Sequence, residues 1–258
     1  MLKKLKYQCE LFWLALGFFT RIPIPSSTPY SETRMNRAGR YFPLVGLLIG
    51  VMVCVIYLGL AYVLPISTAV LLTMVASVLL TGAFHEDGLA DMADGIGGGM
   101  TVERRLEIMK DSRLGTYGTI TLVLALLLKW QLLVELLSSG LVAPLMIFLL
   151  GYALSRATAV TLIHDMKYVT DIDTSKSKPL AQRQTLGEYW LAWAFGILPL
   201  LWLPLRPALL LLLVMLVQRW LFQWWLNKRL GGFTGDCLGA VQQVTEITLY
   251  LVLLMLLQ

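Results

Sequence analysis

The sequence carries little charge. Asp, Glu, Lys and Arg make up 14% of its 258 residues, whereas 57% are hydrophobic, and the mean hydropathy is +0.72. A soluble globular domain normally has about 25% charged residues, and a disordered chain is poor in apolar residues. Both classes are therefore excluded, and the composition predicts a protein that lies in a membrane.

Cysteine is also scarce. The chain has three cysteines, Cys9, Cys54 and Cys237, and none of them stand in a C-x-x-C arrangement. An odd number without paired spacing excludes a disulfide scaffold. We expect three reduced thiols, because free cysteines are commonly buried as small apolar side chains.

Alternation of apolar and polar residues is missing from the long apolar blocks, which excludes a β-barrel. About 20 apolar residues are needed for a helix to cross the hydrocarbon core. The sequence therefore predicts an all-α, polytopic transmembrane helix bundle with about seven spans, forming a single integral-membrane catalytic domain over residues 1–258. The expected spans are 43–64, 66–84, 119–137, 141–163, 189–205, 207–226 and 240–257.

The first apolar run, residues 11–20, is too short to span upright and is followed by Ile22-Pro23-Ile24-Pro25. We expect a short N-terminal helix in the membrane interface. A signal peptide is the competing interpretation, because three lysines precede the run. No A-x-A site follows and Glu10 adjoins the apolar core, so we expect the segment to be retained.

Basic residues gather in alternate loops. Of the 21 Lys and Arg residues, 17 fall before the first expected span or after the second, fourth and sixth. This bias marks the cytoplasmic side and predicts a multi-pass membrane protein with a cytoplasmic N-terminus and an external C-terminus. Attraction to the lipid bilayer explains the net charge of +5, so no nucleic-acid partner is expected.

Four carboxylates follow the second apolar block within nine residues: Glu86, Asp87, Asp91 and Asp94. If the helix continues, the three aspartates are spaced i, i+4 and i+7 and share one stripe. A cation among them would relieve their repulsion, and hard oxygen ligands favour Mg²⁺. We expect these four residues to be metal ligands; a solvated helix end is the alternative.

A basic stretch comes next and includes Lys110, Asp111 and Arg113. Arginine binds phosphate through two parallel hydrogen bonds, and lysine acts as a point charge. Metal-binding carboxylates beside a basic, glycine-rich loop are typical of phosphoryl transfer. The neighbouring Arg104 and Arg105 are equally explained by the bias of cytoplasmic loops.

Several charges lie inside apolar blocks. Arg156 and Arg219 should face the bundle interior or reach the interface, and Arg156 is placed to contact a phosphate or one of the carboxylates. Lys129, Glu135 and Glu246 are interpreted as structural, or as lying in a wet cavity.

Two further segments adjoin the candidate site. His85 directly precedes the carboxylates and is either a general base or an interfacial histidine. The stretch 231–240 contains four glycines with Thr234, Gly235 and Asp236, which suits a loop that binds an anion where the last helix begins. A tight turn is the alternative.

The combination of these stretches resembles the cobalamin synthase family, the membrane-bound adenosylcobinamide-GDP ribazoletransferases. The similar stretches occur in the family's order over essentially the full length: 18–23, 39–43, 82–99, 109–118 and 231–240. The resemblance implies that the ribose hydroxyl of α-ribazole, or of its 5′-phosphate, attacks the cobinamide-linked phosphate of adenosylcobinamide-GDP, with Mg²⁺ present. GMP then leaves, and adenosylcobalamin or its phosphate forms.

On this interpretation the carboxylates from Glu86 to Asp94 are the candidate Mg²⁺ ligands, with one of them or His85 as the base. The candidate phosphate contacts are Lys110, Arg113 and Arg156, while Asp111 completes the metal site or orients a cation. Residues 234–236 are expected to line the site from the other end of the chain. A homo-oligomer, or association with other late enzymes of the pathway, is left open.

Two alternative functions remain. The acidic motif is similar to that of CDP-alcohol phosphotransferases, whose opening would correspond to Asp87-Gly88-Leu89-Ala90-Asp91. The order and the charge differ, however, and the later half of the motif is absent. A transporter would also have several spans and buried charges. Against a transporter, the charge is concentrated at one membrane face.

Overall fold

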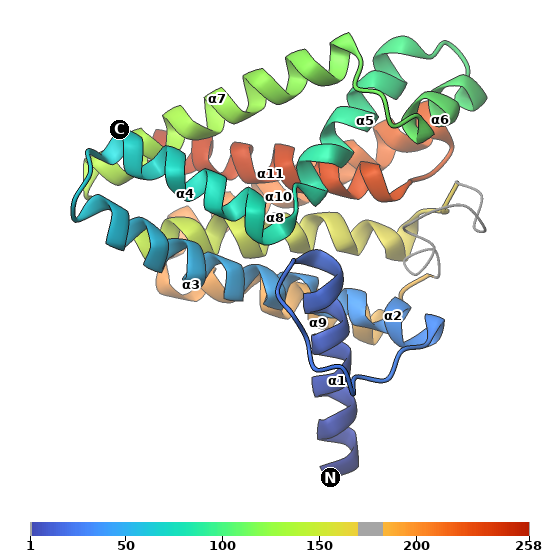
Figure 1. Cartoon of the computed structure of the whole chain (residues 1–258), viewed down its shortest axis with the longest axis horizontal. Coiled ribbons are helices and arrows are strands. Elements are labelled where there is room, and N and C mark those ends of the chain that lie inside the picture. Colours follow the sequence, from blue (N-terminus) through green and yellow to red (C-terminus); the bar gives the residue numbers. More distant parts are fainter. Residues whose placement is uncertain (1, 170–182, 258) are drawn as a thin grey trace.

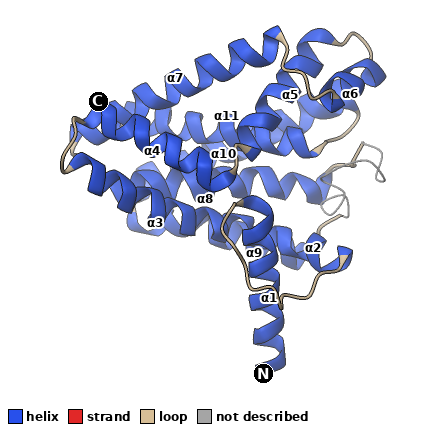
Figure 2. Ribbon diagram, viewed as in Figure 1, coloured by secondary structure: helices blue, strands red, loops and turns tan. Residues whose placement is uncertain are grey.

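The computed structural model describes residues 2–169 and 183–257. Figure 2 shows helices joined by loops in these ranges, with no strand. The architecture is therefore an all-α helix bundle, as predicted. An isolated parallel bridge joins Tyr168 to Phe233 and connects two loops at one end of the bundle.

The helices follow the apolar blocks. Their bounds are α1 Leu2–Phe19, α2 Glu32–Ala38, η1 Gly39–Tyr41, α3 Phe42–Ala61, α4 Ile66–Thr81, α5 Phe84–Gly98, α6 Val102–Lys110, α7 Thr116–Ser139, α8 Pro144–Asp165, α9 Leu186–Ile197, η3 Leu198–Trp202, α10 Leu205–Leu230 and α11 Gly235–Met255. In Figure 1 the α3–α4 link lies at the same end as the C-terminus, and α5 and α6 lie at the opposite end. We call this opposite end the polar end.

Each expected span has a helical counterpart, but the count of long helices is lower. Within the described residues, five helices are long and apolar enough to cross a membrane, or six if the bent pair α4 and α5 is one span. The expected span 189–205 instead forms α9, of 12 residues, followed by the short η3. Pro199 lacks the N–H that the next α-helical hydrogen bond would need, and α9 ends at Ile197, shortly before it.

The second expected span does not continue into the acidic stretch. Gly82 and Ala83 adopt left-handed backbone angles, with φ of 67° and 57°, and α5 leaves α4 at 88°. Glycine adopts this conformation without strain, which allows the break. The carboxylates thus lie on a separate helix across the polar end, rather than on an extension of the membrane span.

The core is centred on α8 and α11. Of their most apolar stretches, 89% and 72% of residues are buried, compared with 28% in α7 and 22% in α10. The exposed faces of α7 and α10 carry large apolar residues such as Leu124, Leu127 and Leu213, as expected for surfaces that meet lipid tails. Arg219 of α10 faces inward, where it pairs with Asp165 and donates to the Thr161 carbonyl at 2.9 Å.

The N-terminal helix α1 runs across the bundle and projects beyond it (Figure 1). It is tied to α2 by an ion pair between Glu10 and Arg34 at 2.5 Å. Its first turns expose Leu2, Leu5 and the lysines. A helix is therefore present where the sequence predicted one, although its 18 residues make it longer than expected; its location in the membrane interface stays a prediction.

Candidate active site

The acidic helix α5 lies at the polar end, beside the first residues of α7 and α11 (Figure 1). Asp87, Asp91 and Asp94 keep the predicted i, i+4, i+7 spacing along it. Their surroundings differ: Asp87 is exposed, Asp91 is half-buried and Asp94 is buried. The stripe therefore does not offer three equivalent ligands.

Asp94 closes the start of α7. Its two carboxylate oxygens accept hydrogen bonds from the backbone N–H groups of Gly115 at 2.7 Å and Gly118 at 2.8 Å. The N-cap residue of α7 is glycine, which has no side chain to satisfy these groups, so a carboxylate from another helix does so. A Cβ at Gly118 would lie 2.3 Å from an Asp94 oxygen, which leaves no room for a side chain.

Glu86 points away from the aspartate stripe, towards the bundle interior. Its Oε1 accepts a hydrogen bond from Gln243 Nε2 at 3.0 Å, and its Oε2 is buried with no hydrogen-bond partner within residues 2–169 and 183–257. Gln243 also donates to Gln242 Oε1 at 3.0 Å. Glu86 is thus part of a polar chain that runs along α11.

This chain ends at a buried ion pair, and we call the whole set the interior network: Glu86, Lys129, Gln242, Gln243 and Glu246. Lys129 Nζ lies 2.7 Å from Glu246 Oε1, and both side chains are at most 6% exposed. Gln242 donates to the other Glu246 oxygen at 2.7 Å. The sequence left open whether Lys129 and Glu246 are structural or lie in a wet cavity. A buried ion pair of this kind agrees with the structural role.

Arg156 also lies inside the bundle. It is 1% exposed, it donates to the Tyr152 carbonyl at 3.0 Å, and its guanidinium lies over the rings of Tyr152 and Phe42. The aromatic faces and the backbone oxygen stabilise a charge in this position. Its expected contact with a phosphate stays a prediction.

His85 is buried, at 2% exposure, and stacks on Phe42 with ring centroids 5.4 Å apart. Its Nε2 has no hydrogen-bond partner in the described parts of the chain. The ring therefore lies behind α5, on the bundle side. The general-base role of His85 stays a prediction, and a ring that is 2% exposed has little access to solvent.

The basic loop after α6 contains a local ion pair. Arg113 donates hydrogen bonds to both carboxylate oxygens of Asp111. Its Nε lies 3.0 Å from Oδ1 and from Oδ2, and its Nη2 lies 2.5 Å from Oδ2. The Arg113 guanidinium lowers the pKa of Asp111 to about 2, and Asp111 in turn raises the pKa of Arg113. Lys110 is exposed at the end of α6. Lys110 and Arg113 are thus cations on the surface of the polar end.

The two arginines at the start of α6 behave differently. Arg105 donates to the carbonyls of Gly99 at 2.9 Å and Arg229 at 2.8 Å, so it ties α6 to the end of α10. Arg104 pairs with Glu107 on the helix surface at 2.7 Å. Arg105 therefore has a structural role that neither sequence interpretation anticipated.

The start of α11 packs directly on α5. A Cβ at Gly88 would lie 2.7 Å from the Asp236 carbonyl oxygen, and one at Gly239 would lie 3.2 Å from the His85 carbonyl oxygen. Thr234 caps α11 by accepting a hydrogen bond from the Cys237 N–H at 3.3 Å. Residues 234–236 therefore meet the acidic helix, which brings together the two segments expected from opposite ends of the chain.

No group of three or more His, Cys, Asp and Glu side chains in the described residues has an arrangement that could hold a metal ion by itself. The reason lies in the partners given above, since Asp94 caps α7 and Glu86 joins the interior network. Asp87 and Asp91 are the expected ligands that stay on the outer stripe. We call them the outer pair.

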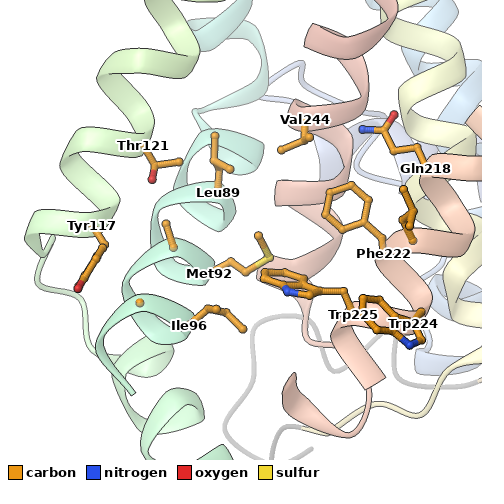
Figure 3. A pocket seen from close by; sticks show the side chains of 13 residues that line it. Leu89, Met92, Ile96, Tyr117, Thr121, Gln218, Phe222, Trp224, Trp225 and Val244 are labelled. Carbon is orange, nitrogen blue, oxygen red and sulfur yellow. The ribbon is translucent and has the colours of Figure 1, made fainter. Parts of the chain in front are cut away.

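An apolar cavity of about 670 Å³ lies against the face of α5 that is opposite the aspartate stripe. Figure 3 shows Met92 and Ile96 of α5 facing Phe222 and Trp225 of α10, with Tyr117 of α7 at one side. The i, i+4 spacing of Met92 and Ile96, opposite the aspartates, is the signal that marks this second face. Such a lining suits an apolar or flat aromatic group.

Comparison with known proteins agrees with the sequence resemblance. Residues 11–254 match the family described as Cobalamin-5-phosphate synthase. The chain is 54% identical to a Vibrio parahaemolyticus protein named adenosylcobinamide-GDP ribazoletransferase, over 97% of this chain and 94% of the relative. Proteins of the same name are 52% identical in Vibrio vulnificus, over the full length of both, and 52% identical in Shewanella frigidimarina, over 96% and 95%.

No solved structure matches the chain. The sequence relationship nevertheless extends over every helix from the middle of α1 to the end of α11. A match of this extent, together with identities above one half, establishes common descent and a common fold. The chain belongs to the cobalamin-5-phosphate synthase family.

Proposed function

We propose that this chain is an adenosylcobinamide-GDP ribazoletransferase. It transfers the adenosylcobinamide phosphate group from adenosylcobinamide-GDP to the ribose hydroxyl of α-ribazole or α-ribazole 5′-phosphate. GMP is released, and adenosylcobalamin or its 5′-phosphate forms in this late step of cobalamin biosynthesis. The observation that carries the proposal is the 54% identity, over 97% of the chain, to a protein of that name.

The chemistry requires a site for a pyrophosphate, and the polar end offers the residue types for one. The outer pair, Asp87 and Asp91, lies on the outward stripe of α5, and Asp236 adjoins that helix at Gly88. Lys110, at the end of α6, and Arg113, on the loop after it, supply cations. We propose Lys110 and Arg113 as contacts to the phosphates, because positive charge stabilises the negative charge that develops on the leaving GMP.

The outer pair suits Mg²⁺ better than a four-carboxylate cage does. Magnesium in phosphoryl-transfer enzymes is commonly bound through one or two carboxylates together with water and substrate phosphates. Asp87 and Asp91 would be those carboxylates, with Asp94 and Glu86 keeping the helix in place. When bound there, such an ion would supply positive charge to neutralise the phosphates.

The attacking hydroxyl needs a proton acceptor near the outer pair. A carboxylate on the outward side of α5 or at the start of α11 faces the same end of the bundle as the cationic loop, whereas the His85 ring is 2% exposed. We therefore favour a carboxylate, with Asp236 and Asp91 as the candidates. Residues 234–236 would then line the site, in agreement with their position beside Gly88.

The polar end is proposed to face the cytoplasm, and the bilayer to be the bacterial inner membrane. The argument is the distribution of the basic residues, of which 17 out of 21 precede the first expected span or lie in the loops after the second, fourth and sixth. A nucleotide-linked substrate would then reach the site directly from the cytoplasm.

The test uses the full chain purified into lipid nanodiscs. Incubation with adenosylcobinamide-GDP, α-ribazole and Mg²⁺ should give GMP and a cobalamin in equal amounts, measured by chromatography, and EDTA should stop both. GMP release without the acceptor would indicate a hydrolase. CMP release from a CDP-alcohol would support the related phosphotransferase, and uptake of substrate into sealed vesicles without product would support a carrier.

A further inference from the structure

A second polar cavity lies away from the acidic helix, between α2 and the start of α9. Its volume is about 160 Å³, and its lining is Thr33, Asn36, Arg37, Arg183, Gln184, Thr185 and Glu188. In Figure 1, α2 and α9 lie together near α1, whereas α5 and α6 lie across the bundle. We call this space the α2–α9 cavity. None of its lining residues takes part in the proposed transfer reaction.

Two arginines give the α2–α9 cavity its positive charge. Arg37 donates to the Tyr7 hydroxyl at 3.3 Å, and Arg183 donates through Nε to the His164 carbonyl at 2.6 Å. A guanidinium carries five N–H donors, so each of these contacts leaves further donors available. Both side chains are exposed, which lets them turn towards a ligand in the cavity.

Gln184 provides the observation that points to a ligand. The residue is 5% exposed and lines the cavity, yet neither its Nε2 nor its Oε1 has a hydrogen-bond partner in the described chain. Burial of an amide without partners is unfavourable, and such groups in folded proteins are nearly always satisfied. Both atoms are covered and do not face the open space of the cavity. A rotation of the side chain towards the cavity would bring them to a ligand that both accepts and donates hydrogen bonds.

The acidic residue in the wall does not cancel this charge. Glu188 is held by Arg40, whose Nη2 lies 2.7 Å from Glu188 Oε1, and it also accepts the Thr185 N–H at 2.8 Å in the capping box of α9. This pair is neutral as a unit. The lining therefore presents Arg37 and Arg183, with hydroxyl and amide groups, at the N-terminus of a 12-residue helix, where anions are favoured.

We propose that the α2–α9 cavity binds a phosphate group. Forked guanidinium donors match the geometry of phosphate oxygens, and the Gln184 amide adds a donor to the phosphate and an acceptor for a neighbouring hydroxyl or ammonium. A phospholipid headgroup and free phosphate share this chemistry. The contact between Arg37 and Tyr7 of α1 places the cavity beside the helix expected to lie on the membrane surface.

The binding test uses the full chain in detergent and two probes. Native mass spectrometry measures retained phosphatidylglycerol, and phosphorus NMR measures binding of inorganic phosphate. Retention of the lipid without binding of phosphate identifies a headgroup, whereas binding of phosphate alone identifies a soluble source. A protein that binds neither probe overturns the proposal.

Variants assign the binding to this cavity. Arg37→Gln and Arg183→Gln should each weaken binding about tenfold through loss of a charge-assisted hydrogen-bond pair. Arg37→Lys should lie in between because it keeps the charge without the fork, and Gln184→Leu should also weaken binding. The matched control is Arg104→Gln, an exposed arginine on α6 that pairs with Glu107. Binding by all the cavity variants at the level of this control contradicts the assignment, and an unchanged unfolding temperature excludes misfolding as the cause.

Discussion

The outer pair and the interior network place the same chemical group in opposite surroundings. Asp87 and Asp91 lie on the outward stripe of α5, exposed and half-buried. Glu86, one residue earlier, instead faces Gln243 in the bundle, and Glu246 beyond it is paired with Lys129. Neighbouring residues of a helix point in different directions, so the carboxylates of one dense acidic motif face different surroundings. Part of it is available for substrate and metal, and part is committed to holding the helices together.

The outer pair should produce the largest effect on turnover. Asp87→Asn or Asp91→Asn keeps the shape of the side chain and removes its charge, and we expect GMP release to fall at least ~10³-fold, about 4 kcal/mol of lost transition-state stabilisation. Initial rates at saturating substrate would be compared with those of Glu135→Gln. Glu135 is an exposed carboxylate near the other end of α7, contacted by Gln131.

Wild-type rates in both variants would remove the outer pair from the chemistry. Circular dichroism and size-exclusion chromatography of the same samples establish that the helices are retained. A variant that loses activity while Mg²⁺ dependence is unchanged would point to proton acceptance instead of metal binding.

The interior network should instead control stability. Lys129→Met leaves the Glu246 carboxylate buried without its nearest cation, which we expect to lower the free energy of unfolding by about 3 kcal/mol. Adding Glu246→Gln to the same chain should recover part of this loss, because the uncompensated charge is removed. Unfolding by SDS titration, followed by circular dichroism, measures both. Equal stability of Lys129→Met and the wild type would show that the pair is dispensable.

Asp94 lies between these two classes and sharpens the comparison. Asp94→Asn keeps one acceptor oxygen for two backbone N–H groups, and we expect it to cost about 1 kcal/mol of stability. Because we assign it to capping α7, its turnover should exceed that of Asp87→Asn by at least about tenfold. If turnover were as low as that of Asp87→Asn in a stable protein, the result would support Asp94 as a metal ligand.

The smallest effect is expected for the pH dependence of Asp111. Arg113 stabilises the charged carboxylate, so its pKa is about 2, below the ordinary value of about 3.9. A lowered pKa contributes stability above the unfolded value and loses it as pH falls towards 2. The side chain should thus stay ionised throughout the neutral range. Carbon NMR of labelled aspartate would follow the titration, and Arg113→Gln should move its midpoint upwards.

Much of the fold follows from local sequence properties. Continuous apolar blocks predicted an all-α bundle, and every expected span has a helical counterpart. Residues 234–236 were expected to lie at the same site as the acidic helix, and the two segments do pack together at Gly88 and Gly239. These features are readable because hydrophobic length and small residues act over a few neighbouring positions.

The different roles of the four carboxylates could not be predicted from the local sequence. Glu86 is bound by a residue 157 positions later, and Asp94 caps a helix whose own N-cap is a glycine. Both roles depend on which helices become neighbours in space. The turn at Ala83 was also hidden, because alanine is a good helix former and is seldom left-handed.

The short helix α4 has a consequence for the surrounding lipid. Its 16 residues rise only about 24 Å, less than the roughly 30 Å of a typical hydrocarbon core. Hydrophobic mismatch of this kind is relieved by thinning of the local bilayer. Headgroups should dip towards the turn at Gly82, and water would follow them. A bulky, water-soluble substrate would then reach the acidic helix without crossing the hydrocarbon core.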